Sequence, residues 1–117
     1  MSGGIIEQSN IIEVRQGDSF DIFIHLQKNG QNINLSDAVV SLTVYDFIGS
    51  GVILKKDAVG VDLKNGKVCL EICPEDTEKM LEGDYSCTIK VHMENGRVHT
   101  FFPQGISRRG TFRVIPK

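Results

Sequence analysis

The chain alternates hydrophobic and polar residues over short stretches that are separated by turn-forming residues. Such a period of two predicts β-strands with one face in a hydrophobic core and the other toward solvent. The pattern predicts strands at 11–16, 19–27, 39–46, 52–58, 61–63, 67–73, 84–93, 97–102 and 110–115, and a short return strand at Ile33 and Leu35. The side chains expected to point inward are Phe20, Ile22, Ile24, Leu26, Val40, Leu42, Val44, Val68, Leu70, Ile72, Tyr85, Cys87, Ile89, Val91, Met93, Phe112 and Val114.

Turn signals lie between these strands at regular intervals. Asn-Gly pairs occupy positions 29–30, 65–66 and 95–96, and both residue types tolerate the positive φ of a tight turn. A fourth turn, with two glycines, is predicted at 47–51. The stretches 52–58 and 61–63 are predicted as two strands or as one broken strand.

A polar segment near 74–82 is the part of the sequence that predicts a helical turn. Pro74 suits its first position, and Glu75 and Asp76 suit the positive end of the helical dipole. Gly83 then breaks the turn, and Tyr85 opens the next strand. We expect this segment to form a corner that carries the chain from one sheet to the other.

The number and spacing of the strands predict the fold class. About seven to nine short strands, with no helix long enough to connect parallel strands, indicate an all-β, antiparallel two-sheet sandwich. A length of 117 residues corresponds to one domain. We expect residues 1–10 to be a flexible N-terminal lead and residues 11–117 to form a single sandwich domain.

Composition and charge narrow the class of protein. A hydrophobic content of 40% and a charged content of 24% are typical of a globular domain. With a net charge of −2, the chain has no basic field for nucleic acid. No apolar run approaches the roughly 20 residues of a membrane helix, and residues 1–10 lack the features of a secretory signal. We therefore expect neither a nucleic-acid nor a membrane partner.

The three cysteines are candidates for disulfide pairing or for a zinc site. Their odd number prevents complete pairing and favours synthesis in a reducing compartment. Cys69 and Cys73 share one face of a strand but lie about 13 Å apart along it, too far for one zinc ion. We expect both on the outer or partner-facing side, and Cys87 as a small buried hydrophobe.

The histidines and acidic residues give no clear site. His25, His92 and His99 fall on expected outward positions, and His92 and His99 are candidates for one sheet face. A metal pair and a plain exposed polar face both fit that arrangement. The acidic run from Glu75 lacks the spacing of a calcium loop, and no nucleophile stands beside a base. We expect no catalytic, cofactor-binding or metal-binding residues, and a protein that is not an enzyme.

Some apolar side chains are expected on the outward faces of strands. An exposed patch of this kind is typical of a protein contact, although simple packing under the N-terminal segment explains the same residues. The residues concerned are Phe23, Val39, Tyr45 and Ile53, together with Phe101 and Phe102, whose rings are expected on opposite faces.

The corner resembles immunoglobulin domains in one motif. Tyr85 stands two residues before Cys87, as a Tyr precedes the second core cysteine of those domains. The strand at 19–27 has no cysteine to pair with it, however, and the chain contains no Trp. These departures disfavour a cell-surface immunoglobulin domain and leave the sandwich architecture intact.

A second resemblance covers nearly the whole chain. The motifs that carry it are Gly17-Asp18-Ser19-Phe20, Leu35-Ser36-Asp37-Ala38-Val39, Val44-Tyr45-Asp46, Pro74–Thr77, Gly83-Asp84-Tyr85, Gly96–Thr100 and Gly110-Thr111-Phe112-Arg113-Val114. In this order and spacing the chain resembles the small immunoglobulin-like β-sandwich domains of tailed-phage and prophage structural proteins. These include the N-terminal domain of upper baseplate proteins and related tail or head-decoration modules. The segment 102–109 departs from the pattern and is a candidate for a feature particular to this chain.

The resemblance implies a non-enzymatic virion structural protein of the tail, baseplate or head decoration. Such a protein is made in the bacterial cytoplasm without a signal peptide and assembles by docking onto other virion subunits, with a homo-oligomer also conceivable. Shape and edge-strand complementarity would provide the binding. Two alternatives remain open: a bacterial adhesin-type or ligand-binding immunoglobulin-like module and, far behind it, a metal-dependent enzyme using the three histidines.

Overall fold

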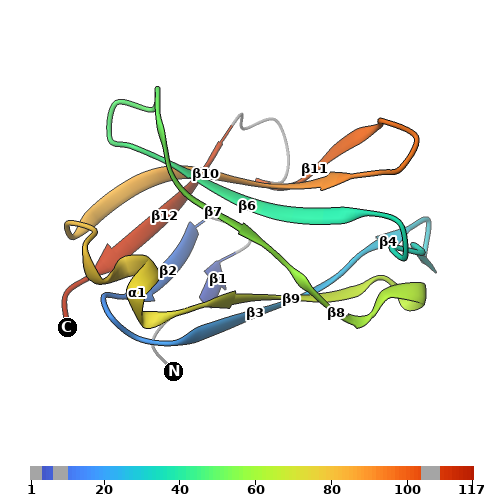
Figure 1. The fold of residues 1–117 in the computed structure, drawn as a ribbon, viewed down its shortest axis with the longest axis horizontal. Coiled ribbons are helices and arrows are strands. Elements are labelled where there is room, and N and C mark those ends of the chain that lie inside the picture. Colours follow the sequence, from blue (N-terminus) through green and yellow to red (C-terminus); the bar gives the residue numbers. More distant parts are fainter. Residues whose placement is uncertain (1–3, 7–10, 104–108) are drawn as a thin grey trace.

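Two β-sheets face each other and enclose the hydrophobic core (Figure 1). The computed structural model describes residues 4–6, 11–103 and 109–117. The larger sheet comprises β1 (Gly4–Ile6), β2 (Ile11–Arg15), β6 (Val39–Tyr45), β7 (Val52–Asp57), β10 (Gly83–His92), β11 (Val98–Phe102) and β12 (Gly110–Ile115). The smaller sheet comprises β3 (Phe20–His25), β8 (Val59–Asp62) and β9 (Lys67–Ile72), and β4 (Gln27–Lys28) and β5 (Gln31–Asn32) form a separate hairpin. A 3₁₀ turn, η2 (Leu63–Asn65), and one short helix, α1 (Pro74–Glu78), complete the described elements.

The order of the strands defines an immunoglobulin-like sandwich. The larger sheet runs β1-β2-β12-β10-β6-β7, with β11 paired to the second half of β10, and the smaller sheet runs β3-β9-β8. Among the described pairings only β2 with β12 is parallel, with Ile12 opposite Phe112. Because β2 is distant from β12 in the sequence, no hairpin dictates its direction. The predicted all-β sandwich is confirmed. Its described strand pairs are antiparallel as predicted, except for the parallel pair of β2 and β12.

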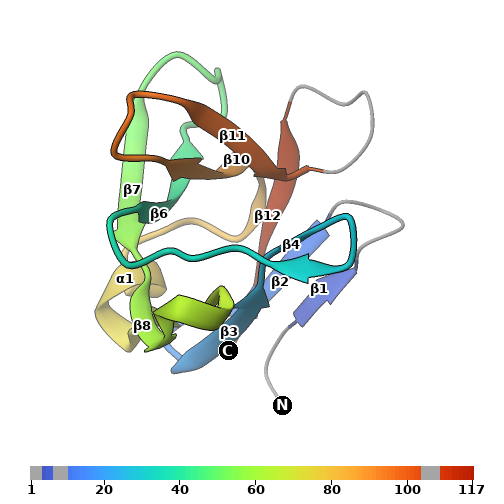
Figure 2. The same ribbon diagram turned by 90° about the vertical axis from the view of Figure 1, so that its right-hand side faces the viewer.

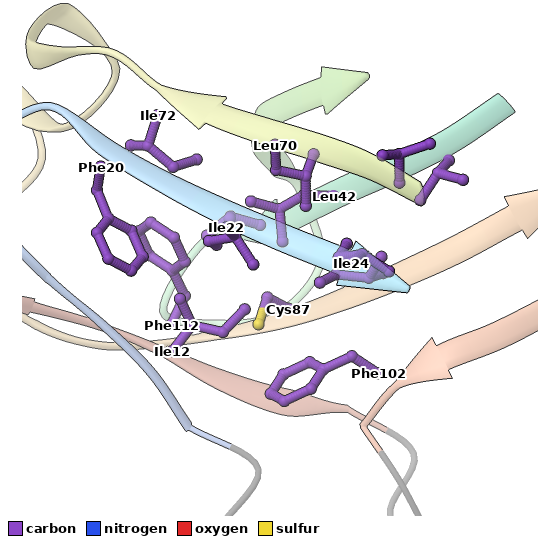
Figure 3. Close-up of a cluster of buried hydrophobic side chains, with 14 of the residues drawn as sticks. Ile12, Phe20, Ile22, Ile24, Leu42, Leu70, Ile72, Cys87, Phe102 and Phe112 are labelled. Atoms are coloured by element: carbon purple, nitrogen blue, oxygen red, sulfur yellow. The ribbon is translucent and has the colours of Figure 1, made fainter. Parts of the chain in front are cut away.

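The core consists of the predicted inward faces of both sheets. Side chains from β3 and β9 point toward those of β6, β10 and β12, and Cys87 lies among them (Figure 3). All of the expected inward residues are buried except Met93, which is partly buried and packs against the same cluster. Strand periodicity therefore predicted the core correctly.

Most predicted elements are present, and nine of the described strands have four or more residues. The return strand expected at Ile33 and Leu35 is wrong, because the strand of that hairpin is β5 at Gln31–Asn32. Leu35 instead donates its N–H to the carbonyl of Leu63 in η2 at 2.7 Å and is buried without belonging to a strand ladder.

One segment passes directly from the larger sheet to the smaller one. The chain leaves β7 at Ala58 and continues into β8 (Figure 2). The Ala58 N–H donates to the carbonyl of Val40 at 2.7 Å, which holds the crossing point against β6. The two predicted stretches are thus two consecutive strands, one in each sheet.

The predicted corner between β9 and β10 is confirmed. Pro74 begins α1, and the Asp76 carboxylate accepts the N–H of Cys73 at 2.7 Å, which caps the helix. The chain then enters β10, where the buried Tyr85 hydroxyl donates to the carbonyl of Leu81 at 2.8 Å. This is the tyrosine corner of immunoglobulin-like sandwiches, in which the hydroxyl bonds to the backbone a few residues upstream.

The corner is also bonded to two other parts of the sandwich. The hydroxyl of Thr77, which is fully buried, accepts the N–H of Gly17 at 2.9 Å, and the Gln16 side chain donates to the carbonyl of Met80 at 2.7 Å. These bonds fix the turn between β2 and β3. On the other side, Lys56 of β7 forms an ion pair with Asp76 at 2.9 Å. The hydrogen bond that the Lys56 ammonium donates to Asp76 raises the pKa of Lys56.

The N-terminal part of the chain is partly described. Residues 4–6 of the expected flexible lead form β1 and pair with β2, with Ile5 opposite Ile12. The rest of residues 1–10 lies outside the described residues. The division into a lead and one domain therefore stays a prediction. Where the structure is described, it contains no helix that is long and apolar enough to span a membrane.

The Tyr85 hydrogen bond gives a first prediction. Tyr85→Phe keeps the ring and removes the bond to Leu81, so we expect it to cost about 1 kcal/mol of unfolding free energy. Differential scanning calorimetry should show a melting temperature lowered by roughly 3–6 °C. Tyr45→Phe is the matched control and should leave the melting temperature nearly unchanged. Equal melting temperatures for Tyr85→Phe and the wild type would show that the bond contributes nothing.

The cysteines give a second prediction. Burial raises the pKa of Cys87 to about 12 and also raises that of Cys69, whereas Cys73 is partly exposed at the start of α1. Because the thiolate is the reactive form, Ellman's reagent at about pH 8 should titrate one thiol quickly in the folded protein. The other two should react only after unfolding. The fast phase should vanish in Cys73→Ser, and its persistence there would contradict the assignment.

Candidate interaction surfaces

The described residues bring together no set of three or more His, Cys, Asp or Glu that would hold a metal ion. Cys69 lies on the outer face as predicted, but it is buried rather than partner-facing. It stands opposite Phe23 in β3 and Val59 in β8, and these two side chains flank it. Cys73 lies beyond the end of β9, with its sulfur 3.8 Å from the Lys56 ammonium.

The proposed common face of His92 and His99 is wrong. The β10–β11 register places His99 opposite Val91, and His92 opposite Val98. Since paired residues share a face and Val91 points inward, the two histidines lie on opposite faces of the sheet. His25 is exposed on β3, where its Nε2 lies 2.8 Å from the side-chain oxygen of Asn32.

The clearest candidate surface lies beside the corner. Phe47, in the β6–β7 loop, stacks on the ring of Tyr85 with centroids 4.2 Å apart and an interplanar angle of 17°. Phe47, Ile53 and Leu81 line one groove of about 540 Å³ with Tyr85, and we call these three exposed side chains the corner surface. Glu75, Asp76 and Lys79 also line this groove, so charged groups border an apolar floor.

Gly83 permits the stacking of Phe47 on the corner. Its φ of +143° lies in a region that side chains disfavour. A Cβ at this position would also approach the Phe47 ring to 3.2 Å. The Gly83 break that the sequence predicts therefore has a second role, since it leaves room for an exposed aromatic ring.

Asp46 fixes the loop that carries Phe47. Its carboxylate accepts backbone N–H bonds from Gly49 at 2.7 Å, Ser50 at 3.1 Å and Gly51 at 3.2 Å. Desolvation acts to raise the pKa of Asp46, but these bonds and one from Ile48 outweigh it, so the pKa lies below its ordinary value. The loop is consequently a defined structure, with Ile48 at its tip 89% exposed.

Arg109 holds the same loop from the other side. Its guanidinium lies 3.5 Å from the centre of the Tyr45 ring and donates to the carbonyl of Gly49 at 2.8 Å. The outward position predicted for Tyr45 thus serves a cation–π contact within the chain. Residues 104–108 of the segment predicted to be particular to this chain lie outside the described residues.

Thr88 marks the place where that segment leaves the sheet. β11 and β12 both pair antiparallel with β10 on the same side, and their registers leave Thr88 without a partner on that side, although it pairs with Thr43 of β6 on the other. The Thr88 hydroxyl is buried and has no hydrogen-bond partner in the described part of the chain. β11 and β12 are therefore two parts of one ladder, interrupted by the segment 103–109.

Two further surfaces carry apolar side chains. On the outer face of the smaller sheet Phe23 is 73% exposed, as predicted, and Val59 and Val61 are also exposed. At the end of the sandwich opposite α1 (Figure 1), an open groove combines an apolar floor with basic groups and no acidic residue. It is lined by Leu26, Gln27, Lys28, Ile33, Val91, Met93, Asn95, Arg97, His99, Thr100 and Phe101.

Sequence reasoning found part of these surfaces. It identified Phe23, Val39 and Ile53, which are exposed, and it missed Phe47 and Leu81. Both missed residues lie in segments that read as turns, where the strand period gives no prediction. The signal that was present is the occurrence of large apolar residues inside polar turns.

The depressed pKa of Asp46 gives a third prediction. A group with a lowered folded-state pKa stabilises the fold above its unfolded value, and this contribution is lost as the pH falls through the folded value. Asp46→Asn should therefore be less stable than the wild type at pH 7, and the difference should shrink once the pH falls below the ordinary value of 3.8. Urea unfolding of both proteins at several pH values measures this. A difference that does not depend on pH would contradict the role of the charge.

Among known structures, a phage domain shares the fold of this chain. The N-terminal domain of phage TP901-1 ORF48 is similar with a TM-score of 0.53 and 21% identity, covering 92% of this chain and 84% of that chain. CopC from Methylosinus trichosporium OB3b follows with a TM-score of 0.49 and 17% identity over 89% and 82% of the two chains. Murine CRIg has a TM-score of 0.41 and 15% identity over 92% of both chains. No curated protein matches the sequence.

A family match covers most of the chain. Residues 5–101, from β1 into β11, match the BppU N-terminal domain, which is the N-terminal domain of the phage baseplate upper protein. The match includes both strands that flank the corner, and the phage domain noted above shares the fold. The chain therefore belongs to the BppU N-terminal domain family of phage baseplate structural domains.

Proposed function

We propose that this domain docks onto a neighbouring virion subunit through the corner surface and so joins that subunit to the baseplate. The observation that carries the proposal is the exposure of three large apolar side chains, Phe47, Ile53 and Leu81, around one groove. Exposed apolar patches on folded domains commonly mark protein contacts. Membership of a baseplate family supports a virion protein as the partner, in preference to the adhesin or ligand-binding alternative.

The groove has the form of a docking site rather than of an active site. Its apolar floor is held in place by the ring of Tyr85, and its charged border includes the ion pair between Asp76 and Lys56. Because the Asp46 loop and the corner are both fixed by hydrogen bonds, the surface is preorganised, and little conformational entropy is lost on binding. The partner is expected to insert one or two apolar side chains and to place polar groups at the border.

Co-expression with the structural proteins of the same particle tests the proposal. Each protein is expressed with this domain, and the complex is isolated by size-exclusion chromatography. We expect one of them to bind, and Leu81→Glu to weaken binding by about tenfold or more, since it places a charge in an apolar contact. Leu81 is 70% exposed, so the variant should fold normally.

Val98→Glu is the matched control, because Val98 is half-exposed on β11, a different strand of the larger sheet. It should bind like the wild type. If none of the structural proteins binds, the docking function is wrong. If one binds and Leu81→Glu binds equally well, docking stands but the assignment to the corner surface is wrong.

A further inference from the structure

Strand β3 lies at the edge of the smaller sheet, with β9 as its hydrogen-bonded neighbour (Figure 1). The order β3-β9-β8 corresponds to strands B-E-D of an immunoglobulin constant-type sheet, whose order is A-B-E-D. The position of strand A is empty among the described residues, because β1 and β2 pair on the β12 side of the larger sheet. One edge of the sandwich thus lacks the strand that usually covers it.

The backbone of this edge is oriented for pairing. Leu26 donates its N–H to the carbonyl of Gly66 at 2.8 Å. This bond continues the β3–β9 ladder by one residue pair. Since N–H and C=O groups of alternate residues point to opposite sides of a strand, Ile22 and Ile24 also bond toward β9. The backbone groups of Asp21, Phe23 and His25 therefore point to the free edge.

The edge strands β7 and β8 carry features that hinder pairing, whereas β3 does not. The β8 ladder is irregular between Gly60 and Asp62, and β7 carries Lys55 and Lys56 in succession. Irregularities and lysines are common protections of sheet edges. The β3–β9 ladder has no register shift, and Phe23 at its centre is 73% exposed.

The charges on the outer face of β3 and β9 have opposite signs at the two ends. Asp21 lies opposite Glu71, which makes one end acidic. His25 lies opposite Lys67, which makes the other end basic, and Asp62 lies beyond Lys67 on the side away from the free edge. The exposed Phe23 lies between these ends. If a second copy of this edge is related to the first by a two-fold rotation about Phe23, the acidic end of one copy lies against the basic end of the other.

We propose that the edge of β3 binds the same edge of a second copy of this chain, as an antiparallel pair about a two-fold axis at Phe23. Phe23 then lies opposite Phe23 of the partner subunit, and Asp21 lies opposite His25 of the partner subunit. These three positions are the ones whose backbone groups face the edge, so each would form a hydrogen-bonded pair. The acidic end of each copy faces the basic end of the other, which makes the interface self-complementary.

This pairing is independent of the docking proposed above, since β3 lies in the smaller sheet and the corner surface is formed by β7, the β6–β7 loop and the segment after α1. Either can fail without the other. The two surfaces together would let a dimer hold two neighbouring subunits.

Sedimentation velocity over a range of protein concentrations tests the pairing. We expect the wild type to form a dimer, and Asp21→Lys to raise its dissociation constant about tenfold, because a lysine then faces the end of the partner subunit that carries Lys67, in both symmetric pairs. The double variant Asp21→Lys with His25→Asp restores the opposite charges and should restore the dimer. Glu94→Lys, at the β10–β11 turn, makes the same change of charge elsewhere and should have no effect.

Amide hydrogen exchange distinguishes strand pairing from other modes of association. The N–H groups of Asp21, Phe23 and His25 should exchange more slowly as the concentration rises, while those of Ile22 and Ile24 are protected at all concentrations. The proposal is overturned if the wild type stays monomeric up to about 1 mM. It is equally overturned if the double variant dimerises no better than Asp21→Lys, or if a dimer forms with the edge amides unprotected.

Discussion

The hydrogen bond from the Tyr85 hydroxyl to the Leu81 carbonyl is the contact around which the crossing between the two sheets is organised. It closes the segment that carries the chain from β9 to β10. Around it, the buried Thr77 hydroxyl accepts the Gly17 N–H, and Asp76 pairs with Lys56. Three crossing regions of the sandwich are thereby joined at one place: the corner, the β2–β3 turn and the strand that leads into β8. Each buried polar group there has a partner, which is what makes such a network favourable in a protein interior.

The same corner explains the surface that the domain presents. Because the hydrogen bond of its hydroxyl holds the Tyr85 ring in place, the ring provides a support on which Phe47 stacks, and Gly83 leaves the necessary space. The Asp46 carboxylate and Arg109 then fix the loop from two sides. An exposed aromatic ring is thus held rigidly instead of collapsing into the core. The chain belongs to a family of phage baseplate structural domains, so the virion is the setting in which this surface is presented.

The sequence predicted the strands, the core and the corner, because these follow from local periodicity and from turn chemistry. Ile89 and Val91 alternate with the polar Lys90 and His92, and their burial in β10 follows that pattern. It did not predict the parallel pairing of β2 with β12, since strand direction between distant segments leaves no local signal. The prediction that His92 and His99 share one face of the sheet was wrong. The register of the β10–β11 pairing decides this, and the sequence leaves that register open. The corner surface was missed because Phe47 and Leu81 lie outside any periodic element.

The sandwich has two features that its strand pattern alone would not indicate: a rigid apolar groove at one corner and an unpaired strand edge. Both result from how the chain passes between sheets, since the crossing at the corner builds the groove and the path of β1 and β2 leaves one edge of β3 without a paired strand among the described residues. They are on different sheets and are suited to different contacts. An assembly domain gains from such a separation, because one contact need not block the other.

Cryo-electron microscopy of the assembled particle measures most directly whether the corner of this domain is an assembly contact. We expect the density to show Phe47, Ile53 and Leu81 covered by a neighbouring virion subunit, with apolar side chains of that subunit seated against the Tyr85 ring. A particle in which this domain is held by other surfaces, with the groove open to solvent, would contradict the central claim.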